Sequence, residues 1–307
     1  MAKQNNVFLY AIVEQKPVIS IDRESKEPIS AMVYVHVVRG VREVKDGKKY
    51  LKHDYPLIVS NDKKMIERMA KWKENDLVHI KGTINSKRIP KKSYCPYCKD
   101  EEDNSTVNIG KGLLLYVTPI YVDVMKSFET KEDAITELLH SREISNQAIV
   151  LGMLWNKPTY YKTKKGLIIT QYQLITERKF RIKTDDPDTR SDWPWVKSYG
   201  EQAIEDRLRL QKGSLIIIDG FIQARNVKRK TKCSCCGNIY EWDDRTMEIV
   251  PFDTEYLQNY KTDQILEDEE GLKAEDLRQA LFNHIIKDEF TEDMNTDDLG
   301  EDVTEAQ

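Results

Sequence analysis

Short apolar runs recur along the chain and predict β-strands. Residues 7–13 and 148–154 are apolar runs that each stop a few positions before a proline, as buried strands often do. Residues 32–38 and 168–176 are rich in β-branched and aromatic side chains, which favour extended backbone. The pattern therefore predicts a mostly β protein.

Two segments depart from this pattern, because their apolar positions recur at helical spacing. One helix is predicted over residues 63–73, with Met69 and Trp72 on its apolar face, and another over 201–211. The strand pattern then returns on both sides of a long basic hairpin, at 77–84 and 113–124 in the first half of the chain and at 215–222 and 247–252 in the second. Three strands, a short helix and two more strands in about 110 residues describe an OB-type barrel, with a β-sandwich as the alternative.

The two halves are copies of one unit. A shift of 138 positions lays residues 28–98 onto 166–236 without a gap. Between 54 and 98 the copies share 12 identities in 45 positions, where chance gives about 3. We therefore expect two tandem OB-fold barrels with long β-hairpins.

These patterns divide the chain into four parts. The barrels are expected at 1–126 and 145–258, and a helical connector at 127–144, where Thr130 and Asp133 are placed to cap a helix. Residues 259–307 form an acidic tail with one amphipathic helix at about 272–290. The rest of the tail lacks apolar side chains and is expected to be disordered.

Charge separates the tail from the body. Residues 263–307 hold 16 acidic and 3 basic residues, a net charge of −13, and the remainder carries 45 basic against 36 acidic residues, a net of +9. A basic body with an acidic tail suits a polyanionic ligand, although a solubilising tail on a solvated body explains the charges equally well. No apolar run approaches the roughly 18 residues of a membrane span, and no export signal is visible at the start, so a cytoplasmic location is expected.

The cysteines fall in two C-x-x-C motifs at equivalent repeat positions. A two-residue gap lets both thiolates reach one metal ion, and a structural zinc site needs four ligands. The simplest hypothesis is one zinc held by Cys95, Cys98, Cys233 and Cys236, which would clamp the two hairpins together. One zinc per unit completed by carboxylates, a site shared between chains, a redox pair and plain buried thiols remain as alternatives.

Aromatic side chains on a barrel surface bind single strands with little sequence preference, because every base offers a flat π-face. Trp193, Trp195 and Tyr199 have the same parity, so on one strand they would project from one face. Tyr55 stands at the position of Trp193 in the first unit. Burial in the core is the alternative for all four rings.

Cations that follow the phosphates are expected on the hairpins, where a basic run recurs in both units. The candidates are Lys87, Arg88, Lys91 and Lys92 on the first hairpin, Arg225, Lys228, Arg229 and Lys230 on the second, and Arg178 and Lys179 elsewhere in the second unit. A solvated charged face without a ligand is the alternative.

The second unit resembles the bacterial single-stranded DNA-binding protein family. Its stretch Trp193-Pro194-Trp195-Val196-Lys197-Ser198-Tyr199-Gly200 is similar to the third-strand signature of that family. Lys212-Gly213-Ser214 is similar to the following turn, and Asp219-Gly220 to the acid-glycine end of the next strand. The resemblance implies sequence-independent single-stranded DNA binding in replication, recombination or repair. Members with two barrels per chain assemble as dimers, so it also implies a possible homodimer.

Three features depart from the family pattern. In the first unit Tyr55 replaces the tryptophan and Asn61 the second aromatic residue, which puts base stacking there in doubt. The tail is acidic but lacks the proline–phenylalanine tip that recruits replication and recombination proteins in the family. The cysteine motifs are also additions, as expected of a specialised member from a phage, plasmid or integrative element.

Two other classes of function compete with strand binding. The barrels could serve as a protein-interaction scaffold, such as a replication or recombination mediator, which the eroded first unit and the tail helix favour. An enzyme is not expected, because the sequence has no H-x-E motif, no paired-carboxylate metal motif and no glycine-rich phosphate loop.

Overall fold

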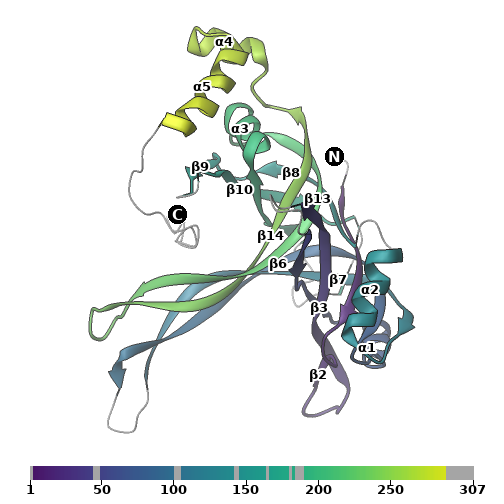
Figure 1. Ribbon diagram of the computed structural model, residues 1–307. Coiled ribbons are helices and arrows are strands. Elements are labelled where there is room, and N and C mark those ends of the chain that lie inside the picture. Colours follow the sequence, from purple (N-terminus) through teal and green to yellow (C-terminus); the bar gives the residue numbers. More distant parts are fainter. Residues whose placement is uncertain are drawn as a thin grey trace.

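Strands dominate the structure, as the sequence pattern predicts. The computed structural model describes residues 3–43, 49–99, 105–141, 145–163, 166–179, 182–183 and 190–287 (Figure 1). Within these residues no helix has the length and the apolar content that crossing a membrane requires.

The first half folds into a closed barrel. Its elements are β1 (Asn5–Val13), β2 (Val18–Ile21), β3 (Pro28–Glu43), β4 (Lys49–Asp54), β5 (Leu57–Ser60), α1 (Lys63–Met69), β6 (Asp76–Lys99) and β7 (Ser105–Ser127). β1 pairs with β6, β6 with β7, β7 with β5, β5 with β3, and β3 again with β1, so the ring closes. In chain order the helix α1 lies between β5 and β6, which are the third and fourth strands of the ring, as in an OB fold.

The second half repeats this arrangement. Its elements are β8 (Asn146–Leu154), β9 (Thr159–Lys162), β10 (Ile168–Glu177), β11 (Ser191–Asp192), β12 (Trp195–Tyr199), α3 (Gly200–Arg209), β13 (Leu215–Lys232) and β14 (Ile239–Gln258). The ring runs β8–β13–β14–β12–β10 and back to β8. The expected pair of OB-type barrels is therefore confirmed.

Equivalent residues stabilise the two barrels in the same way. The amide of Asn5 bonds the backbone N–H and C=O of Ile84, and the amide of Asn146 does the same for Ile222. A β-bulge precedes Gly220, where a Cβ would lie 2.2 Å from the Val250 carbonyl oxygen. Only glycine allows the backbone to come this close.

The barrels are joined through their first strands. β1 and β8 pair antiparallel, with Val7 opposite Ala148 at the centre of the register. Because both strands occupy the same place in their own barrel, this pairing relates the two barrels by an internal two-fold axis. The strands of both barrels thereby form one continuous 14-stranded sheet.

Two reciprocal hydrogen bonds reinforce the junction. Asp54 of the first barrel accepts from the backbone N–H of Ala224 at 3.0 Å, and Asp192 of the second accepts from the N–H of Ser86 at 2.8 Å. Asp54 and Asp192 are repeat equivalents, and so are Ser86 and Ala224. Each barrel therefore binds the base of the other barrel's hairpin.

The hairpins β6–β7 and β13–β14 extend beyond the barrels and lie side by side, forming what we call the arm (Figure 1). Their facing sides carry the polar contacts that join them. Ser93 Oγ lies 2.7 Å from the hydroxyl of Tyr240, and Lys91 Nζ forms an ion pair with Asp244. Lys91 crosses Gly112 to reach this carboxylate, since a Cβ there would lie 2.3 Å from Lys91 Cγ.

The connector and the tail both pack on the barrels. In the connector, α2 (Lys131–Ser141) buries Ala134 and Leu138 beside the first barrel, and Thr130 Oγ1 accepts from the N–H of Asp133 at 3.2 Å. The tail has two helices where the sequence analysis predicted one: α4 (Asp263–Glu270) and α5 (Ala274–Lys287). The disorder expected in the tail outside 272–290 is contradicted at residues 263–270, which form α4. The expected disorder of residues 291–307 falls outside the described residues.

Ion pairs attach this helical pair to α3 of the second barrel. Arg278 Nε lies 2.5 Å from Glu205, and Arg209 Nη2 lies 2.8 Å from Asp263. Leu281 adds an apolar contact with the cluster around Ile204. The first part of the tail is therefore a structured attachment to the second barrel.

Candidate nucleic-acid interface and metal centre

The predicted aromatic strand is interrupted. β12 begins at Trp195, and Trp193 stands in the break between β11 and β12. Pro194 has no N–H for the ladder, which explains why strand pairing lapses here. The expectation that all three rings share one strand face is therefore wrong for Trp193, whereas Trp195 and Tyr199 keep the same parity on β12.

None of these three rings is sealed in the core. Val196, Lys197 and Ser198 are buried on β12, while Trp195 and Tyr199, which share the face of Lys197, are half-buried. Trp193 is also half-buried, and its backbone N–H donates to Ser86 Oγ at 2.9 Å. Trp193 thus lies where the second barrel meets the hairpin of the first.

A fourth ring, Trp155, was missed by the sequence analysis. Trp155 directly follows β8 and is 48 % exposed. Its backbone N–H donates to the backbone carbonyl oxygen of Gln173 at 2.9 Å. Gln173 is directly opposite Trp195, so the three residues form a row and their side chains share one face. Comparison of the repeats hides Trp155. The first strands of the two units align at a shift of 141, which lays Asn5 onto Asn146, and this shift places Glu14 at the position of Trp155.

We call this surface the aromatic wall and define it by Trp155, Trp195 and Tyr199. Two cations next to this wall form ion pairs with the same carboxylate. Lys197 Nζ lies 3.5 Å and Arg225 Nε 3.0 Å from the oxygens of Glu248. The wall therefore combines one exposed and two half-buried rings with two cations that share one carboxylate.

In the first barrel, Tyr55 at the position of Trp193 is contacted from within the protein. Arg245 of the second barrel places its guanidinium 4.1 Å from the ring centre of Tyr34 and 5.7 Å from that of Tyr55. His36 stacks on Tyr55 with ring centres 4.9 Å apart. Tyr55, expected to stack on bases, therefore takes part in packing between the barrels.

His36 belongs to a buried polar network. Its side chain is 1 % exposed, its Nε2 lies 2.7 Å from His53 Nδ1, and its Nδ1 lies 3.0 Å from Glu14 Oε1. Lys131 from α2 bonds the same Glu14 oxygen at 2.6 Å. Burial lowers the pKa of His36 to about 4, so its ring is neutral at neutral pH.

The structure does not place Arg178 where a phosphate could reach it easily. Its side chain is 6 % exposed, and its Nε lies 2.8 Å from Asp192 Oδ2. Burial raises the pKa of Asp192 to about 6, and the adjacent Arg178 opposes that shift. The expectation that Arg178 contacts DNA is therefore replaced by a structural role, since this pair supports the carboxylate that binds Ser86.

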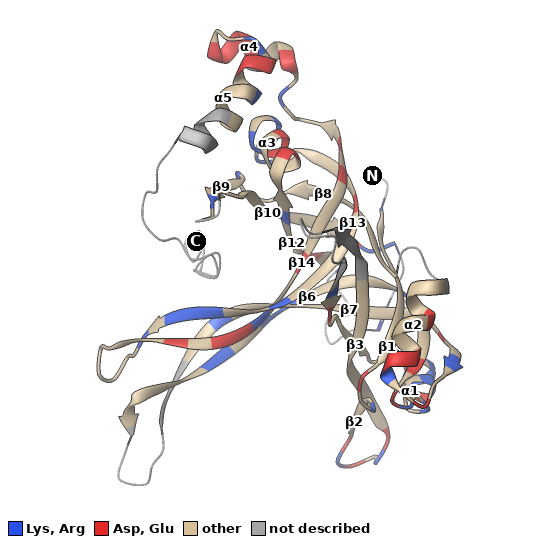
Figure 2. Cartoon of the chain, in the orientation of Figure 1, with Lys and Arg blue, Asp and Glu red and all other residues tan. Residues whose placement is uncertain are grey.

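The hairpin cations form two groups. Lys91 and Arg229 both pair with the buried Asp244, Arg225 pairs with Glu248, and Lys230 lies 3.9 Å from Glu241. The remaining candidates, Lys87, Arg88, Lys92, Lys228 and Lys179, are exposed. Lysine and arginine positions recur along both hairpins, together with some acidic ones (Figure 2).

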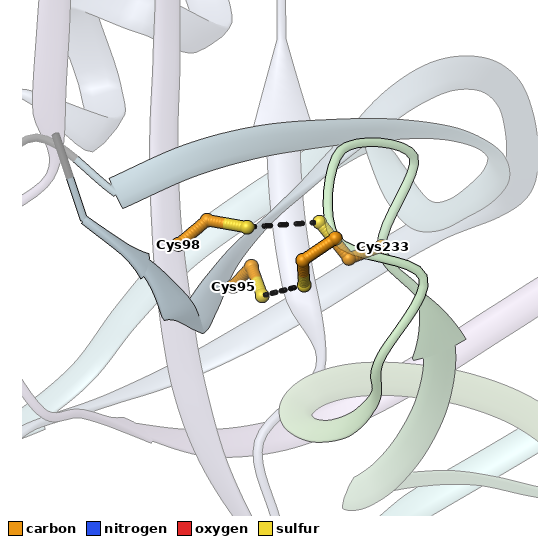
Figure 3. A group of neighbouring side chains, drawn as sticks. Cys95, Cys98 and Cys233 are labelled. Atoms are coloured by element: carbon orange, nitrogen blue, oxygen red, sulfur yellow. Dashed lines mark hydrogen bonds between the residues drawn. The ribbon is translucent and has the colours of Figure 1, made fainter.

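The four predicted cysteine ligands meet at the end of the arm (Figure 3). The Sγ atoms of Cys95 and Cys236 lie 3.7 Å apart, as do those of Cys98 and Cys233, and all four sulfurs are within 4.8 Å of one another. This is far beyond a disulfide bond and close to the roughly 3.8 Å edge of a tetrahedron with metal–sulfur bonds of about 2.3 Å. The cluster is compatible with a metal site.

The surroundings of the sulfurs also suit metal binding. The N–H of Cys235 donates to Cys233 Sγ at 3.4 Å, and such bonds stabilise a thiolate. Gly237, with φ of 73°, closes the turn by donating to Cys233 O at 3.0 Å. Tyr240 packs against Cys95 and Cys233 in a small buried cluster.

Comparison with known proteins agrees with this architecture. The sequence profile of the single-strand binding protein family matches residues 145–235. Among solved structures, a deletion mutant of the single-stranded DNA binding protein from Thermus aquaticus is similar over 84 % of this chain and 97 % of that chain, with 15 % identity and a TM-score of 0.52. The wild-type Thermus aquaticus protein has the same identity over 85 % and 97 % of the chains, with a TM-score of 0.49. No curated protein matches the sequence.

These findings confirm the resemblance to the single-strand binding protein family, which the profile locates in the second barrel and its hairpin. The similarity of fold extends over both barrels. The match is to a family of binding proteins, in agreement with the expectation that the chain is not an enzyme.

Acid is predicted to destabilise the protein through His36. The unfolded chain takes up this proton at about pH 6.5, whereas the folded ring resists it until about pH 4. The contribution of His36 to the free energy of unfolding, up to about 3 kcal/mol, is therefore present above pH 6.5 and is lost as the pH falls toward 4.

Urea unfolding followed by tryptophan fluorescence between pH 7 and pH 4 measures this effect. His36→Gln should lower stability at neutral pH and flatten the dependence on pH, while His140→Gln, at an exposed site, should behave as wild type. Equal pH slopes for His36→Gln and wild type would contradict the assignment.

Proposed function

We propose that the protein binds single-stranded DNA without sequence preference, with bases stacking on the aromatic wall of the second barrel. The observation that carries the proposal is the row formed by Trp155, Gln173 and Trp195, which leaves rings accessible on a barrel that matches the single-strand binding family. Stacking contributes about 1–3 kcal/mol for each base and tolerates any sequence. A strand bound in this way is protected during DNA replication, recombination or repair.

Partner proteins would bind the acidic tail. The helices α4 and α5 fix the start of the tail on α3, and residues 263–307 carry a net charge of −13. An anionic segment suits basic surfaces of replication and recombination proteins and is repelled by DNA. A homodimer of this chain, presenting four barrels, belongs to the same proposal.

The cysteine cluster is proposed to hold one structural zinc ion per chain. Four thiolates at a tetrahedral spacing form a closed site, which suits zinc and leaves no position for catalysis. The two pairs at 3.7 Å each join one hairpin to the other, so a single ion would clamp the arm. This arrangement favours the shared site over one ion per unit.

Loss of a wall tryptophan is predicted to weaken binding. Trp155→Ala and Trp195→Ala should each reduce the free energy of binding to an oligothymidine by about 1–3 kcal/mol, because each removes a stacking surface. Log affinity should fall with log salt by about 0.7 for every phosphate neutralised.

Fluorescence anisotropy with a labelled oligonucleotide provides the measurement, and circular dichroism verifies folding. Phe282→Ala is the matched control, since Phe282 is an exposed ring on α5 of the tail and is not part of the wall. Affinities of both tryptophan variants equal to that of the control would refute the proposed wall.

The zinc hypothesis predicts one ion per chain by elemental analysis of the purified protein. Cys95→Ser and Cys236→Ser should lose the ion, because each removes a ligand from the set. Cys235→Ser should retain it, since Cys235 is exposed and outside that set. Two ions, none, or loss of the ion in Cys235→Ser would rule out a single shared site.

A further inference from the structure

The two hairpins of the arm differ on the faces that point away from each other. On β6 the side chains alternate: Ser93 and Cys95 are buried against the other hairpin, whereas Arg88, Lys92 and Tyr94 are exposed. Residues two positions apart on a strand share a face, so these three exposed side chains lie on the outer side of the arm.

The strand β7 extends the same outer face. Ile109 is directly opposite Lys92, and Lys111 is opposite Pro90. Tyr94 is 61 % exposed and Ile109 67 %. We call this surface the outer track and define it by Arg88, Lys92, Tyr94, Ile109 and Lys111.

The charged side chains of the outer track are all basic. Within the part of the chain that the structure describes, Arg88, Lys92 and Lys111 have no ion-pair partner. Three cations beside an exposed aromatic ring suit a ligand that carries both phosphates and flat bases. That ligand is a single-stranded nucleic acid.

The equivalent face of the second hairpin lacks these properties. Lys230, the repeat equivalent of Lys92, lies 3.9 Å from Glu241, and Lys228 is directly opposite Asp243. The repeat equivalent of Tyr94 is Lys232, so the second hairpin has no aromatic ring at this position. Duplication has therefore left one hairpin suited to a strand and the other largely neutralised.

The outer track begins beside the second barrel. Ser86 has the same parity on β6 as Arg88, and its Oγ accepts from the N–H of Trp193 at 2.9 Å. Its backbone N–H donates to Asp192, the residue before that tryptophan. The internal two-fold axis thus brings the first hairpin to the edge of the barrel that carries the aromatic wall.

We infer that a single strand bound to the second barrel continues onto the outer track and stacks a base on Tyr94. This inference rests on the proposed function and names the path of the strand beyond the barrel. The first barrel contributes its hairpin to the site of the second, while its own Tyr34 and Tyr55 lie against Arg245.

Oligothymidines of two lengths test the path. One of about 8 nucleotides fits a single barrel, and one of about 40 exceeds what two barrels occupy. Tyr94→Ala should weaken binding of the long oligonucleotide about fivefold or more and leave the short one within twofold, whereas Tyr94→Phe should bind both as wild type.

The lysines at equivalent repeat positions form a matched pair. Lys92→Ala should reduce the salt slope for the long oligonucleotide by about 0.7, because it removes one phosphate contact, and Lys230→Ala should leave the slope unchanged. Wild-type affinity of Tyr94→Ala for the long oligonucleotide, or equal effects of the two lysine variants, would overturn the inference.

Binding at the second barrel and binding along the outer track can be distinguished experimentally. If wild-type protein binds the short oligonucleotide and Trp195→Ala does not, the barrel site stands whatever the arm does. If wild-type protein binds neither oligonucleotide, the proposed function falls and the inference falls with it.

Discussion

The antiparallel pairing of β1 with β8 is the constraint on which the rest of the structure depends. Because Val7 lies opposite Ala148, the two barrels take up an internal two-fold relation, and residues at equivalent repeat positions meet across it. The bond from Ser86 to Asp192 and the bond from Ala224 to Asp54 both follow from this relation. So does the arm, since the axis brings the two hairpins together until four cysteines from distant parts of the sequence meet.

Within this symmetric frame the two copies have diverged in chemistry. The second barrel keeps exposed and half-buried rings on its wall, whereas in the first barrel Tyr55 stacks on His36 and lies under Arg245 of the second barrel. The hairpins differ in the opposite sense, because Arg88, Lys92 and Lys111 on the outer side of the first hairpin have no ion-pair partner among the described residues and lie beside Tyr94. A binding surface that combines the second barrel with the first hairpin needs the two-fold junction, since neither unit alone holds both parts.

Features with a short-range signal could be predicted from the sequence. Apolar runs and the 138-residue repeat predicted the two barrels, and C-x-x-C spacing at equivalent positions predicted which four thiols would meet. The family resemblance was noticed in the segment around Trp195, and the family profile matches residues 145–235, which include it. The amphipathic spacing of α5 was recognised, while the largely acidic α4 gave too few apolar positions to be seen.

The features that could not be predicted depend on contacts between residues far apart in the sequence. Lys91 and Arg229 look like free cations in the sequence, yet both pair with Asp244, which is 153 positions from Lys91. Arg178 and Tyr55 likewise resemble DNA-contacting residues in the sequence, whereas in the fold they contact Asp192 and Arg245. Trp155 was not predicted, because its repeat equivalent is Glu14 and comparison of the two repeats therefore gives no signal at this position.

Photocrosslinking tests the central claim, that one strand runs from the second barrel onto the first hairpin, most directly. An oligothymidine carrying a thymidine analogue that reacts under near-ultraviolet light would be bound, irradiated and digested, and the attached peptides identified by mass spectrometry. The account predicts crosslinks to peptides that contain Trp155, Trp195 and Tyr94. Crosslinks to the peptides of Tyr34 and Lys232, in place of these, would show that the strand follows the opposite path and would contradict the account.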